Sequence, residues 1–231
     1  MPKPISAAEG QVMVPGLRVV LVTMDSHLAS AAERAHRSLS KAVPGLSLTV
    51  HAAAEWSDDP AKLKNCIDDI GRGDIVIGSM LFMEDHFLPV LPALQARRDR
   101  CDAMVCLMSA TEVTKLTRMG KFDMSGPTSG PMAFLRKLRG KSTADVNSSA
   151  EDKSTAGARQ MKMLRRLPKI LRFIPGTAQD VRAYFLSMQY WLAGSEQNMV
   201  NLVQFLVDRY ADGARRSLRG RGAVGAPLEY P

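Results

Sequence analysis

The chain has 231 residues, 45% of them hydrophobic, and a formal net charge of +8. This composition is ample for a globular core, and no apolar run approaches the roughly 20 residues that a helix needs to cross a bilayer. The start, MPKPISAAEGQVMVPG, lacks the apolar centre of a signal peptide, so we expect a cytoplasmic protein without a transmembrane segment. Three cysteines, Cys66, Cys101 and Cys106, show no Cys-x-x-Cys spacing, which predicts reduced structural thiols and no metal site.

Strand-like and helix-like segments alternate along the first half of the chain. In chain order, the pattern predicts a strand over 17–24, a helix over 27–43, a strand over 46–53, a helix over 60–70, a strand over 74–78, a helix ending near 98 with Pro89 and Pro92 in or near its first turn, a strand over 103–108, and a helix with Val113, Leu116 and Met119 on one face.

This alternation favours a parallel, doubly wound α/β sheet with right-handed crossovers. The strands at 19–22, 74–78 and 103–108 are almost wholly apolar, which is typical of central strands covered on both faces. Residues 46–53 alternate between apolar and polar, so we expect this strand toward a sheet edge.

The pattern changes after residue 120. Residues 122–131 are rich in turn formers, and a short basic helix is expected around 132–138. Residues 140–157 contain one large aliphatic side chain, Val146, which predicts a disordered polar loop. We therefore expect an N-terminal tail over 1–16, an α/β head domain over 17–139, the polar loop over 140–157, a helical extension over 158–211, and over 212–231 a connector to a carboxy-terminal body outside this chain.

The helical extension carries two apolar stripes. Thr177 and Asp180 resemble a capping box, and a stripe from Val181 to Leu192 follows at helical spacing. Gly194-Ser195 is expected to end this helix and start a second one, whose apolar stripe runs from Met199 to Tyr210. Trp56 and Trp191 are expected to be core or interface anchors.

The loops that follow the strands are the first place to look for a site, because open parallel sheets bind ligands at the carboxyl ends of their strands. Polar side chains follow two of the predicted strands and could converge there: Asp25 and His27 after one, and Ser79, Glu84, Asp85 and His86 after the other. The alternative is that the acids only stabilise the N-termini of the following helices. None of these residues forms a catalytic signature.

Positive charge is concentrated between Lys115 and Arg172, where fourteen Lys and Arg side chains accompany four Asp and Glu. Such a segment could meet nucleic acid, anionic lipid or an acidic protein surface. It lacks zinc-finger spacing and an RNP-type aromatic motif, so we favour a solvated face or a docking surface over nucleic acid. Within it, Arg165, Arg166 and Lys169 are the docking candidates.

Four segments of the chain resemble a known family. They read VVLVTMDSHLASAAERA, DIVIGSMLFMEDH, MSATEVTKLTRMGKFDM and LRFIPGTAQDVRAYFLSMQYWLAGSEQNMVNLVQFLVDRY. Together they are similar to the amino-terminal region of the large porphyrin-binding H subunit of magnesium chelatase, the bacteriochlorophyll-branch relative of the cobaltochelatase large subunit.

The resemblance implies an ATP-driven complex that inserts Mg²⁺ into protoporphyrin IX during bacteriochlorophyll or chlorophyll biosynthesis. In that family the H subunit carries the porphyrin, and two AAA+-type subunits, I and D, hydrolyse ATP. Family members are several times longer than this chain, and their metal insertion is assigned to a carboxy-terminal body. We therefore expect a flavodoxin-like head followed by a helical extension. We expect this region to have no catalytic residue, bound cofactor or metal of its own. Its expected role is to gate the porphyrin site and to contact the body and the partner subunits.

Two other functions stay open on the residues alone. One is a freestanding flavodoxin-like module that binds a small molecule through the loops after Met24, Ile77 and Met108. The other is a basic nucleic-acid binder, which would bind with a steep dependence on salt.

Overall fold

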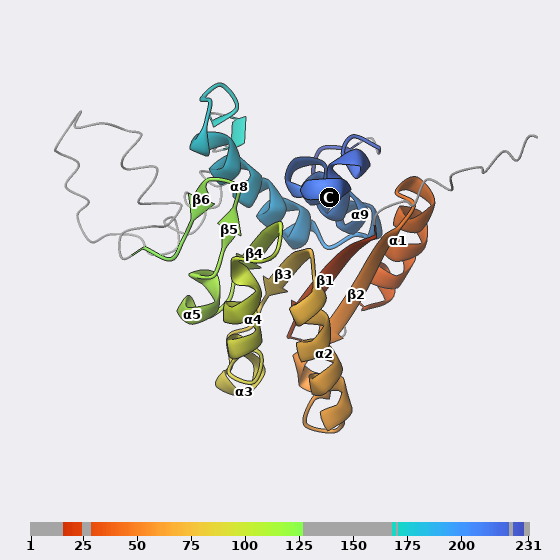
Figure 1. The fold of residues 1–231 in the computed structure, drawn as a ribbon, viewed down its shortest axis with the longest axis vertical. Helices are drawn as coiled ribbons and strands as arrows, with labels where there is room; N and C mark the ends of the chain where they lie inside the picture. The colour runs from red at the N-terminus through yellow and green to blue at the C-terminus, as the bar shows by residue number, and fades with distance from the viewer. Residues whose placement is uncertain (1–15, 25–28, 127–167, 170, 222–223, 229–231) are drawn as a thin grey trace, which may run out of the picture.

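The computed structural model describes residues 16–24, 29–126, 168–169, 171–221 and 224–228. The predicted polar loop at 140–157 and the short helix around 132–138 lie outside these residues. In chain order, the elements are β1 (Leu17–Thr23), α1 (Ala29–Ala42), β2 (Leu46–Ala52), η2 (Ala53–Glu55), α2 (Pro60–Arg72), β3 (Ile75–Ser79), α3 (Glu84–Phe87), α4 (Leu91–Arg98), β4 (Ala103–Leu107), α5 (Thr111–Thr114), β5 (Arg118–Met119), β6 (Phe122–Asp123), α8 (Thr177–Ala193), α9 (Glu196–Tyr210) and η3 (Gly213–Leu218) (Figure 1).

The strands form one six-stranded sheet in the order β2-β1-β3-β4-β5-β6. The first four strands are parallel, as predicted, and the apolar β1, β3 and β4 lie inside while β2 lies at the edge. The short β5 and β6 run antiparallel at the other edge. The predicted doubly wound α/β class is confirmed.

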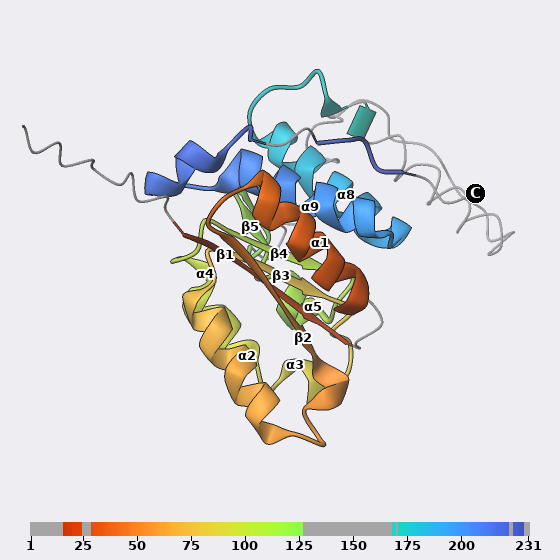
Figure 2. The ribbon, with the colours of Figure 1, turned by 90° about the vertical axis from the view of Figure 1, so that its right-hand side faces the viewer.

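Helices cover both faces of the sheet (Figure 2). One face, with Leu21, Ile77 and Val105, packs with α1, α8 and α9 into one hydrophobic cluster. The opposite face, with Val22 and Val76, packs with α2, α4 and α5 into a second cluster. Both helices of the predicted extension therefore form a layer against the sheet, and α9 also contacts α1.

Three sequence predictions were wrong in detail. The helix expected after β3 is split into α3 and α4, because Pro89 has no N–H to continue the helical ladder. The helix expected to carry Met119 ends at Thr114, and Met119 lies in β5, paired with Ala103 of β4. A helical face and a short buried strand share the same apolar spacing over so few residues.

The third error concerns the capping box. The N-cap of α8 is Gly176, not Thr177, and no side chain caps this end. The Asp180 carboxylate instead accepts hydrogen bonds from the Lys121 backbone N–H and the Tyr210 hydroxyl, at 2.9 and 3.0 Å. It therefore joins the β5–β6 turn to α8 and α9, a long-range role that a local motif does not reveal.

Candidate functional site

The carboxyl ends of the parallel strands meet at one edge of the sheet. Thr23 of β1 and Leu107 of β4 each lie in register with Ser79 of β3. Because side chains alternate along a strand, Ser79 shares the face of Ile75 and Ile77, which is covered by α1, α8 and α9. Ser79 is fully buried, and its hydroxyl has no hydrogen-bond partner among the described residues.

The acidic residues predicted at this edge lie in α3 and not on the face where Ser79 is buried. Glu84 and Asp85 form the exposed first turn of α3, and His86 follows them, half-buried. The next residue, Phe87, packs into the cluster on the opposite face of the sheet. The structure therefore does not bring Ser79 together with Glu84 and Asp85, whereas Asp25 and His27 lie outside the described residues.

The loop between β3 and α3 is held firmly by backbone hydrogen bonds. Met80 adopts a positive φ of 59° and donates its N–H to the Leu107 carbonyl at 3.2 Å. The Leu81 N–H donates to the Ser109 hydroxyl at 3.1 Å, and the Leu81 carbonyl accepts from the Ala110 N–H at 2.9 Å. Leu81 is also fully buried. The loop is therefore fixed to the end of β4 and the residues after it by hydrogen bonds, and to the core by the Leu81 side chain.

This anchored loop presents large apolar side chains to solvent. Phe82 is 54% exposed, Met83 is 53% exposed, and Leu88, just after α3, is 49% exposed. Sequence reasoning missed these residues because it looked for polar groups at the edge. A signal was available in the sequence, since Phe82 and Met83 are large apolar residues between the predicted strand and the predicted helix.

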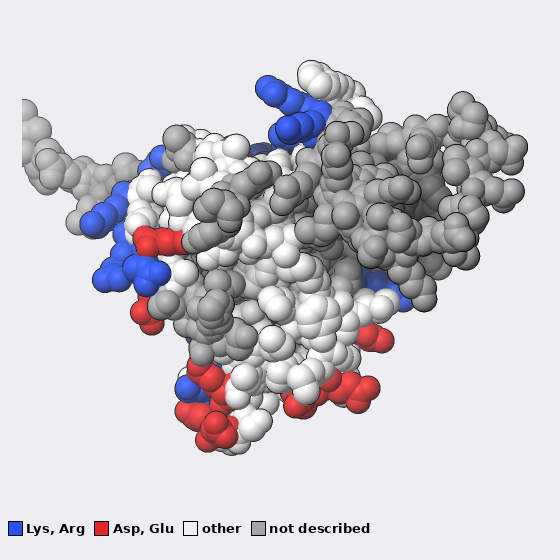
Figure 3. Space-filling model, turned by 180° about the vertical axis from the view of Figure 1, so that it is seen from behind, with Lys and Arg blue, Asp and Glu red and all other residues white. Residues whose placement is uncertain are grey.

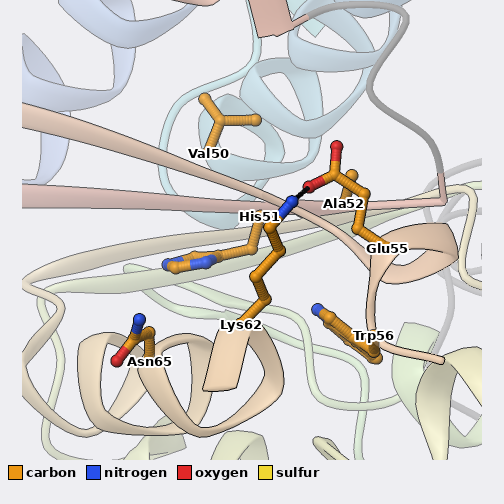
Figure 4. A pocket seen from close by; sticks show the side chains of 7 residues that line it. All are labelled: Val50, His51, Ala52, Glu55, Trp56, Lys62 and Asn65. Atoms are coloured by element: carbon orange, nitrogen blue, oxygen red, sulfur yellow. Dashed lines mark hydrogen bonds and ion pairs between the residues drawn. The ribbon is translucent and has the colours of Figure 1, made fainter. Parts of the chain in front are cut away.

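A second feature of the carboxyl edge is a small pocket between β2 and α2 (Figure 4). Its volume is about 190 Å³, and its lining residues are Val50, His51, Ala52, Glu55, Trp56, Lys62 and Asn65. The Lys62 ammonium lies 2.6 Å from the Glu55 carboxylate, and His51 Nε2 lies 2.9 Å from Asp69. Trp56 is buried, and its indole N–H has no hydrogen-bond partner among the described residues.

Metal-ligating and nucleophilic groups are scarce in the part of the chain that the structure describes. No group of three His, Cys, Asp or Glu side chains there could hold a metal ion. All three cysteines are free and buried, as predicted, and burial raises the pKa of the Cys66 and Cys106 thiols to about 12. These thiols are thus protonated and unreactive at neutral pH.

The basic docking candidates are placed only in part. Lys169 is exposed, and Arg165 and Arg166 lie outside the described residues. In the described part of the chain, no helix is long and apolar enough to cross a membrane.

Comparison with known proteins gives a family and several relatives. The family described as "Domain of unknown function (DUF3479)" matches residues 18–185. The chain is 48% identical to the magnesium-chelatase H subunit of Cereibacter sphaeroides over 96% of its own length and 18% of that protein. It is 46% identical to the magnesium-chelatase H subunit of Rhodobacter capsulatus, over 94% of its length and 17% of the relative. The chloroplastic magnesium-chelatase subunit ChlH of Oryza sativa subsp. indica is 31% identical, over 94% of the chain and 15% of the relative.

The chain thus spans less than a fifth of the length of these curated relatives. The H-subunit matches nevertheless cover 94% or more of this chain, and the DUF3479 match runs from β1 into α8. The resemblance predicted from the sequence is confirmed, and the chain belongs to the DUF3479 family, in a form similar to a region of the magnesium-chelatase H subunit.

Proposed function

We propose that this chain is a docking and gating region of a magnesium chelatase H subunit and that it catalyses no metal insertion by itself. The observation that carries the proposal lies at the carboxyl edge of the sheet. There Phe82 and Met83 of the anchored loop and Leu88, just after α3, reach solvent, whereas Ser79 is buried in the core. Exposed aromatic and Met side chains are typical of protein–protein contacts and not of catalytic sites.

The similarity to H subunits supplies the context for this proposal. In that context the complex uses ATP to insert Mg²⁺, its substrate, into protoporphyrin IX in the cytoplasm, and the I and D subunits are the AAA+-type partners. This region would close over the porphyrin site of the carboxy-terminal body or contact the partners. The basic residues Arg165, Arg166 and Lys169 remain candidates for a contact with an acidic partner surface.

A chimera tests the proposal. The matching region of the Cereibacter sphaeroides H subunit is replaced by this chain, and chelation of Mg²⁺ by a soluble protoporphyrin analogue is followed with the I and D subunits present. We expect an active chimera, an inactive isolated chain, and impaired activity when the region is deleted. If deletion changed neither porphyrin affinity, assembly nor turnover, the proposal would be wrong.

Porphyrin binding by the isolated chain is a separate question that fluorescence can answer. Trp56 and Trp191 are buried in different clusters, one on each face of the sheet. A titration with the soluble porphyrin that quenches both emissions saturably would assign part of the porphyrin site to this region. Absence of quenching, with the full-length H subunit as positive control, would leave it a purely docking and gating role.

The pocket beside Trp56 favours one alternative, a small-molecule-binding module. A buried donor without a partner has lost its hydrogen bond to water, and a ligand acceptor would restore it. Such a ligand would raise the melting temperature of the chain by mass action. A Trp56→Phe variant, which keeps an aromatic ring and removes the N–H, would abolish that rise, whereas a ligand bound elsewhere would stabilise both forms equally.

A further inference from the structure

The exposed apolar side chains beside α3 are held in place rather than displayed on a loose loop. The Met83 carbonyl accepts from the backbone N–H groups of His86 and Phe87, at 3.0 and 3.1 Å. The Leu88 N–H donates to the Glu84 carbonyl at 2.9 Å. With Leu81 and Phe87 buried on either side, the backbone between them loses little further freedom when a partner binds.

Acidic side chains lie next to these apolar groups. Glu84 and Asp85 are exposed on α3, and neither forms an ion pair with another described residue. Asp58 and Asp59 precede α2, next to η2, which α3 contacts. Figure 3 shows Asp and Glu gathered at the lower end of the molecule, which Figure 1 identifies as the end formed by α3 and the start of α2. We call Phe82, Met83, Glu84, Asp85 and Leu88 the α3 tip.

This arrangement specifies the chemistry of a partner. Phe82, Met83 and Leu88 require apolar pockets that remove them from water. The flanking carboxylates require Lys or Arg around those pockets. An acidic or uncharged rim would remove water from the carboxylates without providing a positive charge in its place. An acidic or purely polar surface therefore does not fit the α3 tip.

The size of the α3 tip indicates how the partner is connected. Three apolar side chains and their acidic rim fall short of the roughly 1,000 Å² expected of a stable interface between separate proteins. A surface on the same polypeptide needs less area, because a covalent link supplies a high effective concentration. In the relatives, more than four-fifths of the H subunit lies outside the matched region.

We propose that the α3 tip rests on a basic-rimmed apolar surface of the remainder of the H subunit, so that this region is held against the body from the carboxyl edge of its sheet. The inference rests on the proposed function, since it takes the chain to be part of an H subunit.

Thiol labelling tests the proposal directly, because the native cysteines of this chain are buried. Met83→Cys and, in a second variant, Leu88→Cys are labelled with N-ethylmaleimide, both in the isolated chain and in the chimera described above. Peptide mass spectrometry gives the rate at each position. Leu192→Cys is the matched control, because Leu192 is 52% exposed on α8, in the layer on the opposite face of the sheet.

We expect cysteines at 83 and 88 to react about tenfold more slowly in the chimera than in the isolated chain, because burial at the contact limits access to the thiol. The cysteine at 192 should react at similar rates in both. Adding Glu84→Lys and Asp85→Lys should restore the reactivity of the cysteine at 83 in the chimera, since these changes place cations against the basic rim.

Equal labelling of positions 83 and 88 in the two proteins would overturn the proposal. Protection at position 192 of the same size would also overturn it, because the slowing would then not be specific to the α3 tip. Chelatase activity of the unaltered chimera is measured alongside. An active chimera with an unprotected α3 tip would refute this contact and leave the proposed function intact. An inactive chimera with a protected α3 tip would contradict the proposed function and leave the contact intact.

Discussion

Gly120 has a positive φ of 57° and lies directly against the Asp180 carboxylate. A Cβ atom at this position would come within 2.7 Å of Asp180 Oδ2. The same carboxylate accepts the hydrogen bonds of Lys121 and Tyr210, so it cannot retreat without losing them. We expect Gly120→Ala to lower the free energy of unfolding in urea by more than the roughly 1–2 kcal/mol that a left-handed alanine costs by itself.

The control for this prediction is Gly213→Ala. Gly213 has a similar φ of 58°, but nothing lies within 4 Å of the position that its Cβ would take. This variant should show only the conformational cost. If the two variants were equally stable, the Asp180 side chain would move aside at no cost, and its contact with residue 120 would not contribute to stability.

Asp123 gives the chain a specific sensitivity to acid. Partial burial raises the pKa of Asp123, but hydrogen bonds from Arg98 and Ser125, at 2.6 and 2.7 Å, outweigh burial and lower the pKa to about 2. An unfolded Asp titrates near pH 4. Because the folded pKa is the lower one, the charged carboxylate stabilises the fold above about pH 4, and this contribution is lost as the pH falls toward 2.

We therefore expect Asp123→Asn to be less stable than the unaltered chain near neutral pH, with the difference shrinking between about pH 4 and pH 2. Urea unfolding at a series of pH values measures this. Asp68→Asn, a change of an exposed carboxylate on α2, is the control. A constant difference for Asp123→Asn over this window would contradict the assignment.

At the scale of elements, Arg215 ties the short helix η3 to the amino edge of the sheet. Its guanidinium binds both oxygens of Asp102, at 2.8 and 3.0 Å, and lies 3.4 Å from Asp74. Both carboxylates are largely buried. Removing the guanidinium takes away part of the positive charge that offsets the desolvation of the two carboxylates. We therefore expect Arg215→Met to lower the free energy of unfolding by about 2 kcal/mol.

The same variant should also raise hydrogen exchange across 212–221, because η3 loses its attachment. Arg216→Met is a matched control on the same helix. Arg216 pairs with Asp212 at the surface, where such ion pairs contribute little, so its loss should change neither stability nor exchange appreciably. Equal effects of the two changes would show that η3 is held by its apolar contacts alone.

The elements that could be predicted from sequence are those whose local pattern agrees with their environment. β1, β3 and β4 are mostly apolar because helices cover both of their faces, and α9 begins after Ser195, whose hydroxyl accepts from the Asn198 N–H. β5 and β6 have two residues each, too few for a period to show. Their pairing depends on contact with β4, which only the folded chain provides.

The candidate site was harder to predict for a related reason. The sequence places Ser79 and Glu84 after the same strand, which indicates a common edge but not a common face. Ser79 belongs to the α8 and α9 side of the sheet, whereas α3 packs on the other side through Phe87. The exposure of Phe82 and Met83 depends on the turn at Met80, whose positive φ has no sequence signature in a methionine.

At the scale of the whole molecule, the two C-terminal helices complete the fold. The cluster on one face of the sheet contains residues of β1, β3 and β4 together with Val181, Tyr184 and Leu206 of α8 and α9. The DUF3479 match likewise runs on to residue 185, within α8. The predicted head over 17–139 would, without these helices, expose the apolar face of its central strands.

We therefore expect a chain ending at residue 139 to lack a stable tertiary structure, even though it contains all six strands. The exposed apolar face should bind the dye ANS. The shortened chain should also unfold on heating without a cooperative transition, as a compact state without fixed side-chain packing does. Deletion of 140–157, a segment whose sequence contains one large aliphatic side chain, is the control and should preserve cooperative unfolding. A cooperative transition in the shortened chain would instead make 17–139 an independent domain, with α8 and α9 as an accessory layer.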